Sequence, residues 1–274
     1  MNKRLTRILP VLGTAIILSQ GVIAQESTPA EARETTPPEK PEAPAASPIS
    51  GTLSLDVNTH FISYGADVWA AGNKWNDVLF NPSFELNIAA NDQLKFIIGT
   101  WFDINDNATT SIGDKIVQEM DAWIGVSYSF EKVTVKLLYQ EWMYASESER
   151  IVDLVIGVST FLNPSLTIHG RVDDGLGRET GVVAVAGISH SIPVGSVSIT
   201  FPLNVAFATD EYHGGDAGYA FASLGASASI PLPFMPGNWS LNPAITGYHT
   251  NDDVIPGNPD EAFVTGKIGL TLAF

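Results

Sequence analysis

The chain has 274 residues and no cysteine, and its 14 Lys and Arg residues against 30 Asp and Glu residues leave a formal net charge of -16. Phosphate binding needs a basic surface, so this charge argues against a nucleic-acid partner, and the absence of cysteine excludes disulfides and thiolate metal sites. Only 16% of residues are charged, while 24 Gly and 17 Pro are scattered along the length, which fits neither a disordered acidic chain nor a helical bundle.

The N-terminal 24 residues have the pattern of an export signal. The segment begins with three basic residues, continues with an apolar run over residues 8–18, and ends in the small-residue cleavage site Val22-Ile23-Ala24. A membrane anchor needs about 18 or more apolar residues, and this run is shorter. We therefore expect residues 1–24 to be a cleaved signal peptide that sends the mature chain across the inner membrane.

Residues 25–50 have a different composition. Proline alternates there with Glu, Ala, Thr and Ser, and no large apolar residue occurs before Ile49. Such a stretch cannot bury a core, which predicts an extended periplasmic linker. A role in reaching the cell wall or a partner protein stays open beside the simpler interpretation of a solvated tether. The remaining residues 51–274 are enough for one folded domain.

Alternation of apolar and polar residues with period two dominates this domain. Between Val197 and Phe207 every second residue is apolar, and the residues between them are small or polar. No window of comparable length shows a helical stripe. The pattern predicts twelve strands near residues 53–62, 78–89, 94–103, 118–130, 133–143, 152–162, 165–172, 182–192, 196–208, 219–230, 239–248 and 263–274.

The connections between these strands alternate between short and long. The short ones cover residues 90–93, 131–132, 163–164, 193–195 and 231–238, and the long polar ones cover 63–76, 105–117, 145–151, 173–181, 209–218 and 249–261. Transmembrane barrels have short periplasmic turns and long outer loops, whereas a soluble sandwich has no reason to sort its loops in this way. The sequence therefore predicts an all-β, 12-stranded, antiparallel up-and-down transmembrane β-barrel. It would lie among the lipids of a Gram-negative outer membrane, with both termini in the periplasm.

Charged residues within the predicted strands lie almost entirely on the polar face. The exception is Glu141. This distribution is expected of a barrel, because a charge facing lipid at mid-bilayer would cost about 2–4 kcal/mol. Three acids lie toward the outer mouth, and an acidic mouth predicts weak cation selectivity. The predicted pore-lining residues are Asp56, Glu85, Lys95, Glu119, Asp121, Lys136, Asp153, Arg171 and Lys267.

The last predicted strand alternates up to a C-terminal phenylalanine, Phe274. This ending resembles the terminal assembly signal of bacterial outer-membrane proteins, which implies the barrel-assembly machinery as a partner. The segments Trp123 to Phe130 and Ser223 to Ile230 are similar to strands of the TorF-like porins, a family of small exported barrels. That resemblance implies a barrel, and it carries no functional residue across to this chain.

A porin-like channel for passive diffusion of small solutes or ions is the first functional hypothesis. Twelve strands are intermediate between filled barrels of eight and open barrels of 16 to 18. The inward face is rich in Gly, Ala and Ser, which favours an open lumen. Two alternatives stay open: the charges pair inside a plugged barrel, or the barrel is a structural anchor without a pore.

An outer-membrane hydrolase is a further alternative. A Ser/His hydrolase on a strand needs a His-x-Ser spacing, and none of the five histidines has a serine two residues away, so no catalytic residue is assigned and no enzyme is expected. A protease or metal site at Asp210, Glu211, His213 and Asp216 is weaker than a solvated loop. The calcium-like start at Asp103 departs from the motif at Ala108 and Asp114. No metal and no cofactor are expected.

Four tryptophans divide by position. Trp142 and Trp239 lie near predicted strand ends, where aromatic belts form at membrane interfaces, whereas Trp101 and Trp123 point inward by parity. Belt or packing roles are the simplest interpretation for all of them.

Overall fold

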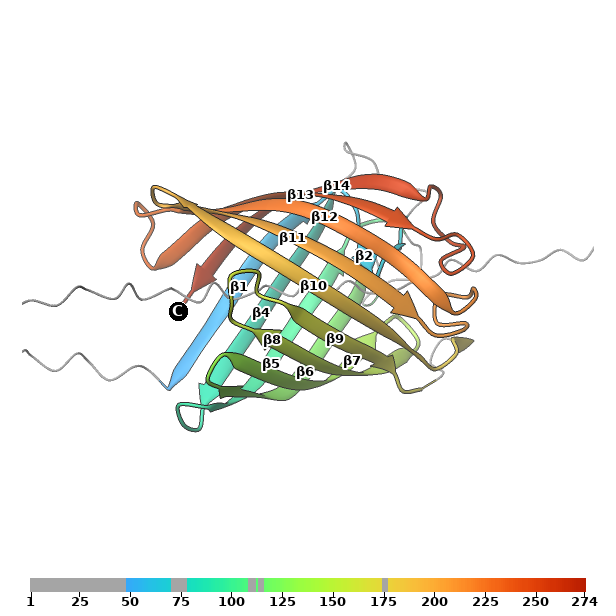
Figure 1. The fold of residues 1–274 in the computed structure, drawn as a ribbon, viewed down its shortest axis with the longest axis horizontal. Helices are drawn as coiled ribbons and strands as arrows, with labels where there is room; N and C mark the ends of the chain where they lie inside the picture. Colours follow the sequence, from blue (N-terminus) through green and yellow to red (C-terminus); the bar gives the residue numbers. More distant parts are fainter. Residues whose placement is uncertain (1–47, 70–77, 108–111, 113–115, 174–176) are drawn as a thin grey trace, which may run out of the picture.

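The computed structural model describes residues 48–69, 78–107, 112, 116–173 and 177–274. The predicted signal peptide and nearly all of the predicted linker lie outside these residues. Within the described chain the strands form a closed, antiparallel, 12-stranded barrel (Figure 1), which confirms the predicted fold class. Each strand pairs with its neighbours in sequence, and the first strand of the barrel pairs with the last. Among the described residues, no helix is long and apolar enough to cross a membrane.

The barrel strands, in chain order, are β1 (Ile49–Asn58), β4 (Leu79–Ala89), β5 (Leu94–Ile104), β6 (Val117–Phe130), β7 (Val133–Met143), β8 (Ser148–Val158), β9 (Ser165–Arg171), β10 (Gly181–Val194), β11 (Val197–Ala208), β12 (Gly218–Pro231), β13 (Asn238–Thr250) and β14 (Ala262–Ala273). Two further strands, β2 (Ile62–Ser63) and β3 (Ala66–Asp67), form a separate small hairpin. The C-terminus and the start of β1 lie at one end of the barrel, here named the terminus end, and the opposite end is named the loop end (Figure 1).

Two predicted strands are displaced along the sequence. The first was expected at 53–62 and lies at 49–58, and the sixth was expected at 152–162 and lies at 148–158. The residues that the predicted and observed ranges share keep their faces, and Asp56 and Asp153 are buried inside the barrel as their parity predicts. The sixth strand starts early because Glu149 extends the ladder opposite Trp142 and buries its carboxylate in the lumen. The alternation of connection lengths is therefore wrong at one place, since the loop-end connection 144–147 is shorter than the turn 159–164.

The outer surface of the barrel is apolar. Leu224 is 63% exposed, and many large side chains of the outward parity are similarly open to the surroundings. A soluble monomer rarely exposes a contiguous patch of this kind, whereas a lipid-facing band requires one. The exposed outward residues include Phe84, Phe96, Ile98, Ile124, Leu137, Tyr139, Ile188, Phe201, Leu203, Ile245 and Ile268. The protein is therefore an outer-membrane-type β-barrel.

The β2–β3 hairpin lies inside the barrel near its loop end. Phe61, Val68 and Trp69 pack against Leu79 and Trp101 of strands β4 and β5. Residues of the same segment also pack against the opposite wall, formed by β10, β11 and β12, in a cluster of Ala66, Val183, Ala206, Phe221 and Ile255. Because these walls lie across the barrel from each other, the segment 59–69, here named the hairpin segment, spans the lumen.

The tip of the hairpin is a two-residue turn. Tyr64 has a φ of 47° and Gly65 a φ of 96°, so both central residues are left-handed, as a tight hairpin turn of this twist requires. A Cβ added at Gly65 would lie 2.4 Å from a ring carbon of Phe221. Glycine is therefore required there twice, by backbone conformation and by close packing on β12.

Candidate functional site at the loop end of the lumen

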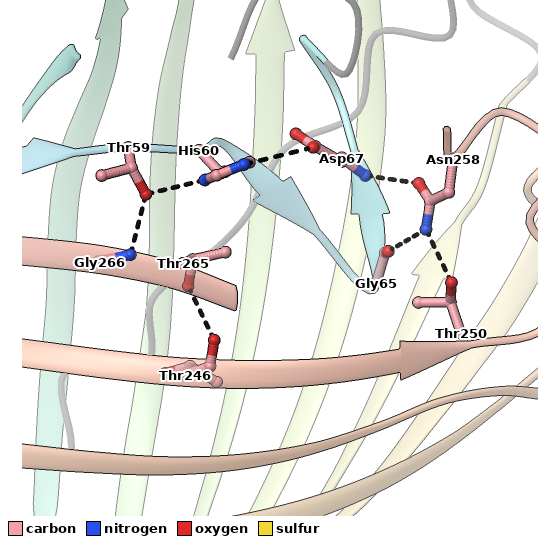
Figure 2. A network of polar contacts seen from close by, with 9 residues as sticks. All are labelled: Thr59, His60, Gly65, Asp67, Thr246, Thr250, Asn258, Thr265 and Gly266. Carbon is pink, nitrogen blue, oxygen red and sulfur yellow. Dashed lines mark hydrogen bonds and ion pairs between the residues drawn. The ribbon is translucent and has the colours of Figure 1, made fainter. Parts of the chain in front are cut away.

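One side chain from another connection holds the hairpin tip. Asn258, in the β13–β14 connection, accepts a hydrogen bond at Oδ1 from the backbone N–H of Asp67 at 2.8 Å. Its Nδ2 donates to the carbonyl of Gly65 at 2.9 Å and to the Thr250 hydroxyl at 3.1 Å (Figure 2). The amide thus satisfies one donor and one acceptor of the hairpin backbone, groups that would otherwise be costly to bury.

The base of the hairpin is tied to the last strand of the barrel. The backbone N–H of Gly266 donates to the Thr59 hydroxyl at 2.8 Å (Figure 2). The Thr59 N–H donates in turn to the Gly266 carbonyl at 2.9 Å. Nδ1 of His60 lies 2.8 Å from the same hydroxyl, and its Nε2 lies 3.9 Å from an Asp67 carboxylate oxygen. Burial lowers the pKa of His60, so the imidazole is neutral at neutral pH and the contact with Asp67 is not an ion pair there.

The hairpin tip stacks on a buried histidine. The rings of Tyr64 and His169 have centroids 3.8 Å apart, and Trp142 stacks on His169 with centroids 5.2 Å apart. His169 Nδ1 lies 2.6 Å from one oxygen of Asp153, and Gln140 donates to the other oxygen at 2.6 Å. Trp142 is fully buried inside the barrel, so it is not part of an interfacial belt.

A second buried group centres on Glu149, which lies in β8 and not in the loop 145–151 that the sequence predicts. Arg171 Nε lies 2.5 Å from one carboxylate oxygen, and an Arg178 nitrogen lies 2.9 Å from the other. Arg171 also donates to the carbonyl of Tyr212 at 3.0 Å and lies 4.3 Å from the centroid of its ring. The parity that Glu149 shares with Ile151 and Asp153 is the sequence signal that could have placed it in the lumen.

Asp103 supports the hairpin from β5. Its carboxylate accepts hydrogen bonds from Trp69 Nε1 at 2.8 Å, from Asn81 Nδ2 at 2.9 Å and from Asn105 Nδ2 at 2.8 Å. Trp69 belongs to the hairpin segment, so the carboxylate joins the hairpin to the barrel wall. Asp103 thus accepts hydrogen bonds from three N–H groups, whereas the calcium-like motif in the sequence would make it a metal ligand. Positions 108 and 114 of that motif lie outside the described residues.

The nine predicted pore-lining residues all lie on the inward parity, but their exposure differs. Glu119, Asp121, Asp153 and Arg171 are buried at the loop end beneath the hairpin. Near the end of β1 Asp56 pairs with Lys267 at 3.0 Å, and on β4 Glu85 accepts a hydrogen bond from Trp123 at 3.3 Å. Lys136 is half-buried and Lys95 is exposed. Only Asp56 and Lys267 are brought together as an ion pair.

The acidic loop considered as a protease or metal site is not assembled. His213 is buried, whereas Asp210, Glu211 and Asp216 are exposed. Across the described part of the chain, no group of three or more His, Asp or Glu side chains is arranged to hold a metal ion. Burial, with the positive charge of Arg171 as the next cause, lowers the pKa of His213 to about 3.

Comparisons with known proteins give no family. No protein-family model matches the chain, and no curated protein matches it. Among solved structures, the translocator domain of autotransporter NalP from Neisseria meningitidis is 10% identical with a TM-score of 0.45, covering 82% of this chain and 88% of that one.

Two further solved structures are similar at the same level. OmpF of Salmonella typhi in complex with daunomycin is 6% identical with a TM-score of 0.41, covering 82% of this chain and 97% of that one. LpxR from Salmonella typhimurium is 8% identical with a TM-score of 0.40, covering 81% and 100%. The fold assignment rests on the strand ladder and the apolar exterior, and the resemblance to TorF-like porins stays a prediction.

Proposed function

We propose that this protein is an outer-membrane channel for passive diffusion of small solutes or ions. In this structure the hairpin segment closes the channel. The observation that carries the proposal is the contrast between the two halves of the lumen. The loop half is filled by one short segment and its buried partners. Small polar side chains line the terminus half and stay partly exposed, among them Ser54, Ser198, Ser227, Ser229 and Thr271.

The proposed orientation places the loop end outside the cell and both termini in the periplasm. Exposed acids then gather at the outer face, including Asp210, Glu211, Asp252, Asp253 and Asp260. Such a surface raises the local concentration of cations. Inside the barrel Asp153 is hydrogen-bonded to His169 and Gln140, and Arg171 is paired with Glu149, and all of these groups are buried. Any selectivity of the open channel therefore comes from the outer acids and from partly exposed groups such as Glu85 and Lys136. We expect weak cation selectivity.

Conductance of the refolded protein tests this proposal. In one variant a Gly/Ser segment replaces residues 60–69, and in a control variant a Gly/Ser segment replaces the turn 232–237 at the other end. We expect small or rare openings from the wild type and the control, and larger, longer openings with weak cation preference from the hairpin variant. A hairpin variant that folds, as shown by heat-modifiable migration on a denaturing gel, and does not conduct would refute the channel. Clear anion preference would refute the charge assignment.

A structural barrel without a pore is the second candidate. The apolar packing of the hairpin segment on both walls favours it, because a permanently filled lumen needs no displaceable segment. In that case neither variant conducts, and deletion of residues 26–47, which ends before β1, produces an envelope defect while the barrel still assembles. We assign no catalytic residue in either case.

A further inference from the structure

Two lysines lie in one row on the inward face of the barrel, close to its terminus end. In the strand ladder Lys95 of β5 is opposite Ser127 of β6, and Ser127 is opposite Lys136 of β7. Neighbouring strands are about 4.8 Å apart, so the backbones of the two lysines are separated by about 10 Å. Because both stems are long and flexible, the two ammonium groups can reach a common point in front of the Ser127 hydroxyl.

The two ammonium groups have no protein partner. In the described part of the chain, Lys95 and Lys136 make no hydrogen bond and no ion pair through their side chains. The other inward Lys and Arg side chains of the described strands, Arg171 and Lys267, are each paired with a carboxylate. Lys136 is half-buried, so its charge is partly removed from water without a counter-charge, which is unfavourable.

The inward acid of the adjoining strand β4 is engaged elsewhere. Glu85 accepts hydrogen bonds from Trp123 at 3.3 Å and from Asn87 at 3.1 Å. The exposed acids Asp92 and Glu131 lie in turns at the rim, and within the described residues neither forms an ion pair with the lysines. The row therefore carries positive charge that the protein leaves uncompensated.

Space for a ligand lies beside the row. Gly157 of β8 has the inward parity and is opposite Thr134, and a Cβ added at this glycine would have no atom within 4 Å. Ser127 is 6% exposed, and its hydroxyl makes no hydrogen bond to another described residue. A donor thus faces open lumen between the two ammonium groups.

An oxyanion would satisfy these groups together. Each ammonium group offers three donors and the serine hydroxyl offers one, and a phosphate group has several acceptor oxygens and negative charge. A cation would be repelled, and a neutral solute would leave the charges uncompensated. We propose that Lys95, Ser127 and Lys136 form a binding site for a small oxyanion, either inorganic phosphate or the phosphate group of a small solute. The site is reached from the terminus end, so binding does not require the hairpin segment to move.

Lysine acylation of the full-length refolded protein, read by mass spectrometry, tests the site with inorganic phosphate as the probe. A bound oxyanion covers both amines, so only the empty site reacts. With phosphate at about ten times its dissociation constant, labelling of Lys95 and Lys136 should be about tenfold slower than in chloride of equal ionic strength. The two lysines should share one midpoint in a phosphate titration. Lys132, exposed in a turn at the same end, is the internal control and should keep its rate.

Unchanged rates at both lysines, or equal slowing at Lys132, would overturn the site, and this comparison needs no variant to fold. Lys136→Gln should abolish the protection of Lys95, because one ammonium group alone holds the ion weakly. Lys132→Gln is the matched control and should leave the protection intact. Full protection of Lys95 in folded Lys136→Gln would show that the two lysines do not share an ion, which would also overturn the site.

The effect of the site on permeation rests on the proposed function and can fail separately. When a Gly/Ser segment replaces residues 60–69, phosphate added at the terminus end should lower the current through open channels, and Lys136→Gln should remove this effect. Protection without a lower current would keep the binding site and refute its position on the permeation path. The outer acids lie at the opposite mouth, and salt screens charges within about 8 Å, so oxyanion binding is compatible with weak cation selectivity.

Discussion

Replacing Asn258 with alanine should release the hairpin segment from the barrel wall. The substitution removes the hydrogen bonds of the side chain to Asp67, Gly65 and Thr250. It leaves the apolar contacts of the hairpin in place, so the barrel itself should assemble normally. The expected effect is a larger population of molecules in which the hairpin has left its docked position.

The magnitude follows from the bonds that are lost. A typical hydrogen bond contributes about 1 kcal/mol net, and a buried group left unsatisfied costs about 1–3 kcal/mol. Thr250 can turn to another partner, so the two hairpin backbone groups determine the effect. We expect docking to weaken by about 1–3 kcal/mol, which corresponds to about a 5- to 150-fold increase in the undocked population.

The cysteine-free chain offers a direct assay. Ala66 is 6% exposed in the docked hairpin, so the single probe Ala66→Cys should react with a maleimide only when the hairpin leaves the wall. Its labelling rate in the Asn258→Ala background is compared with the probe alone and with Asn91→Ala. Asn91 accepts from two backbone N–H groups in a turn at the terminus end, which makes it a matched control. Equal rates in all three proteins, or rapid labelling of the probe alone, would refute the clamp.

Three other outcomes are expected. His213 faces the backbone of Tyr64 at the hairpin tip, so undocking should expose its imidazole. Because the buried histidine has a pKa of about 3 and an exposed one about 6.5, acid should favour the undocked state by about 2 kcal/mol at about pH 5. The same cysteine probe should therefore label faster at that pH in the wild type and not in His213→Gln; identical pH profiles would exclude this histidine. Gly65→Ala should weaken docking by about 1–3 kcal/mol, as measured by chemical unfolding. The effect of Gly177→Ala should be smaller, because Gly177 also has a positive φ but has open space around it. Deletion of Phe274 should lower the heat-modifiable fraction of the protein, whereas Phe234→Ala, at an 80% exposed turn residue, should not; normal assembly without Phe274 would argue against a terminal assembly signal.

Strand parity could be predicted from the sequence because it is a local property. The alternation around Glu119 and Asp121 places both side chains inside, and no distant contact is needed to see it. The same reasoning missed Glu149, because three polar residues in succession at the start of β8 resemble a loop. Its place in the ladder depends on pairing with β7 and on the charge of Arg171, which period two does not report.

The hairpin segment could not be found in this way. Its two strands have two residues each, too few for an alternating pattern, and it was divided between the end of a predicted strand and a polar loop. What turns it inward is the packing of Phe61 on Trp101 and of Gly65 on Phe221, contacts between residues far apart in the chain. A consequence is that the sequence placed Asp153 and Arg171 at an open mouth, whereas the structure buries them beneath the hairpin.

Closure of the barrel also determines the order in which contacts form during folding. The N–H and carbonyl of Gly51 pair with those of Phe274, so the first and last strands join only when the whole chain is present. Trp101, on the first wall that the hairpin contacts, follows it closely in sequence. Phe221, on the second wall, and Ile255, in the β13–β14 connection, come more than 150 residues later. An unfinished barrel therefore leaves one side of the hairpin without its partners, and docking of that side belongs to the last, slow step of folding, when contacts of long sequence separation form.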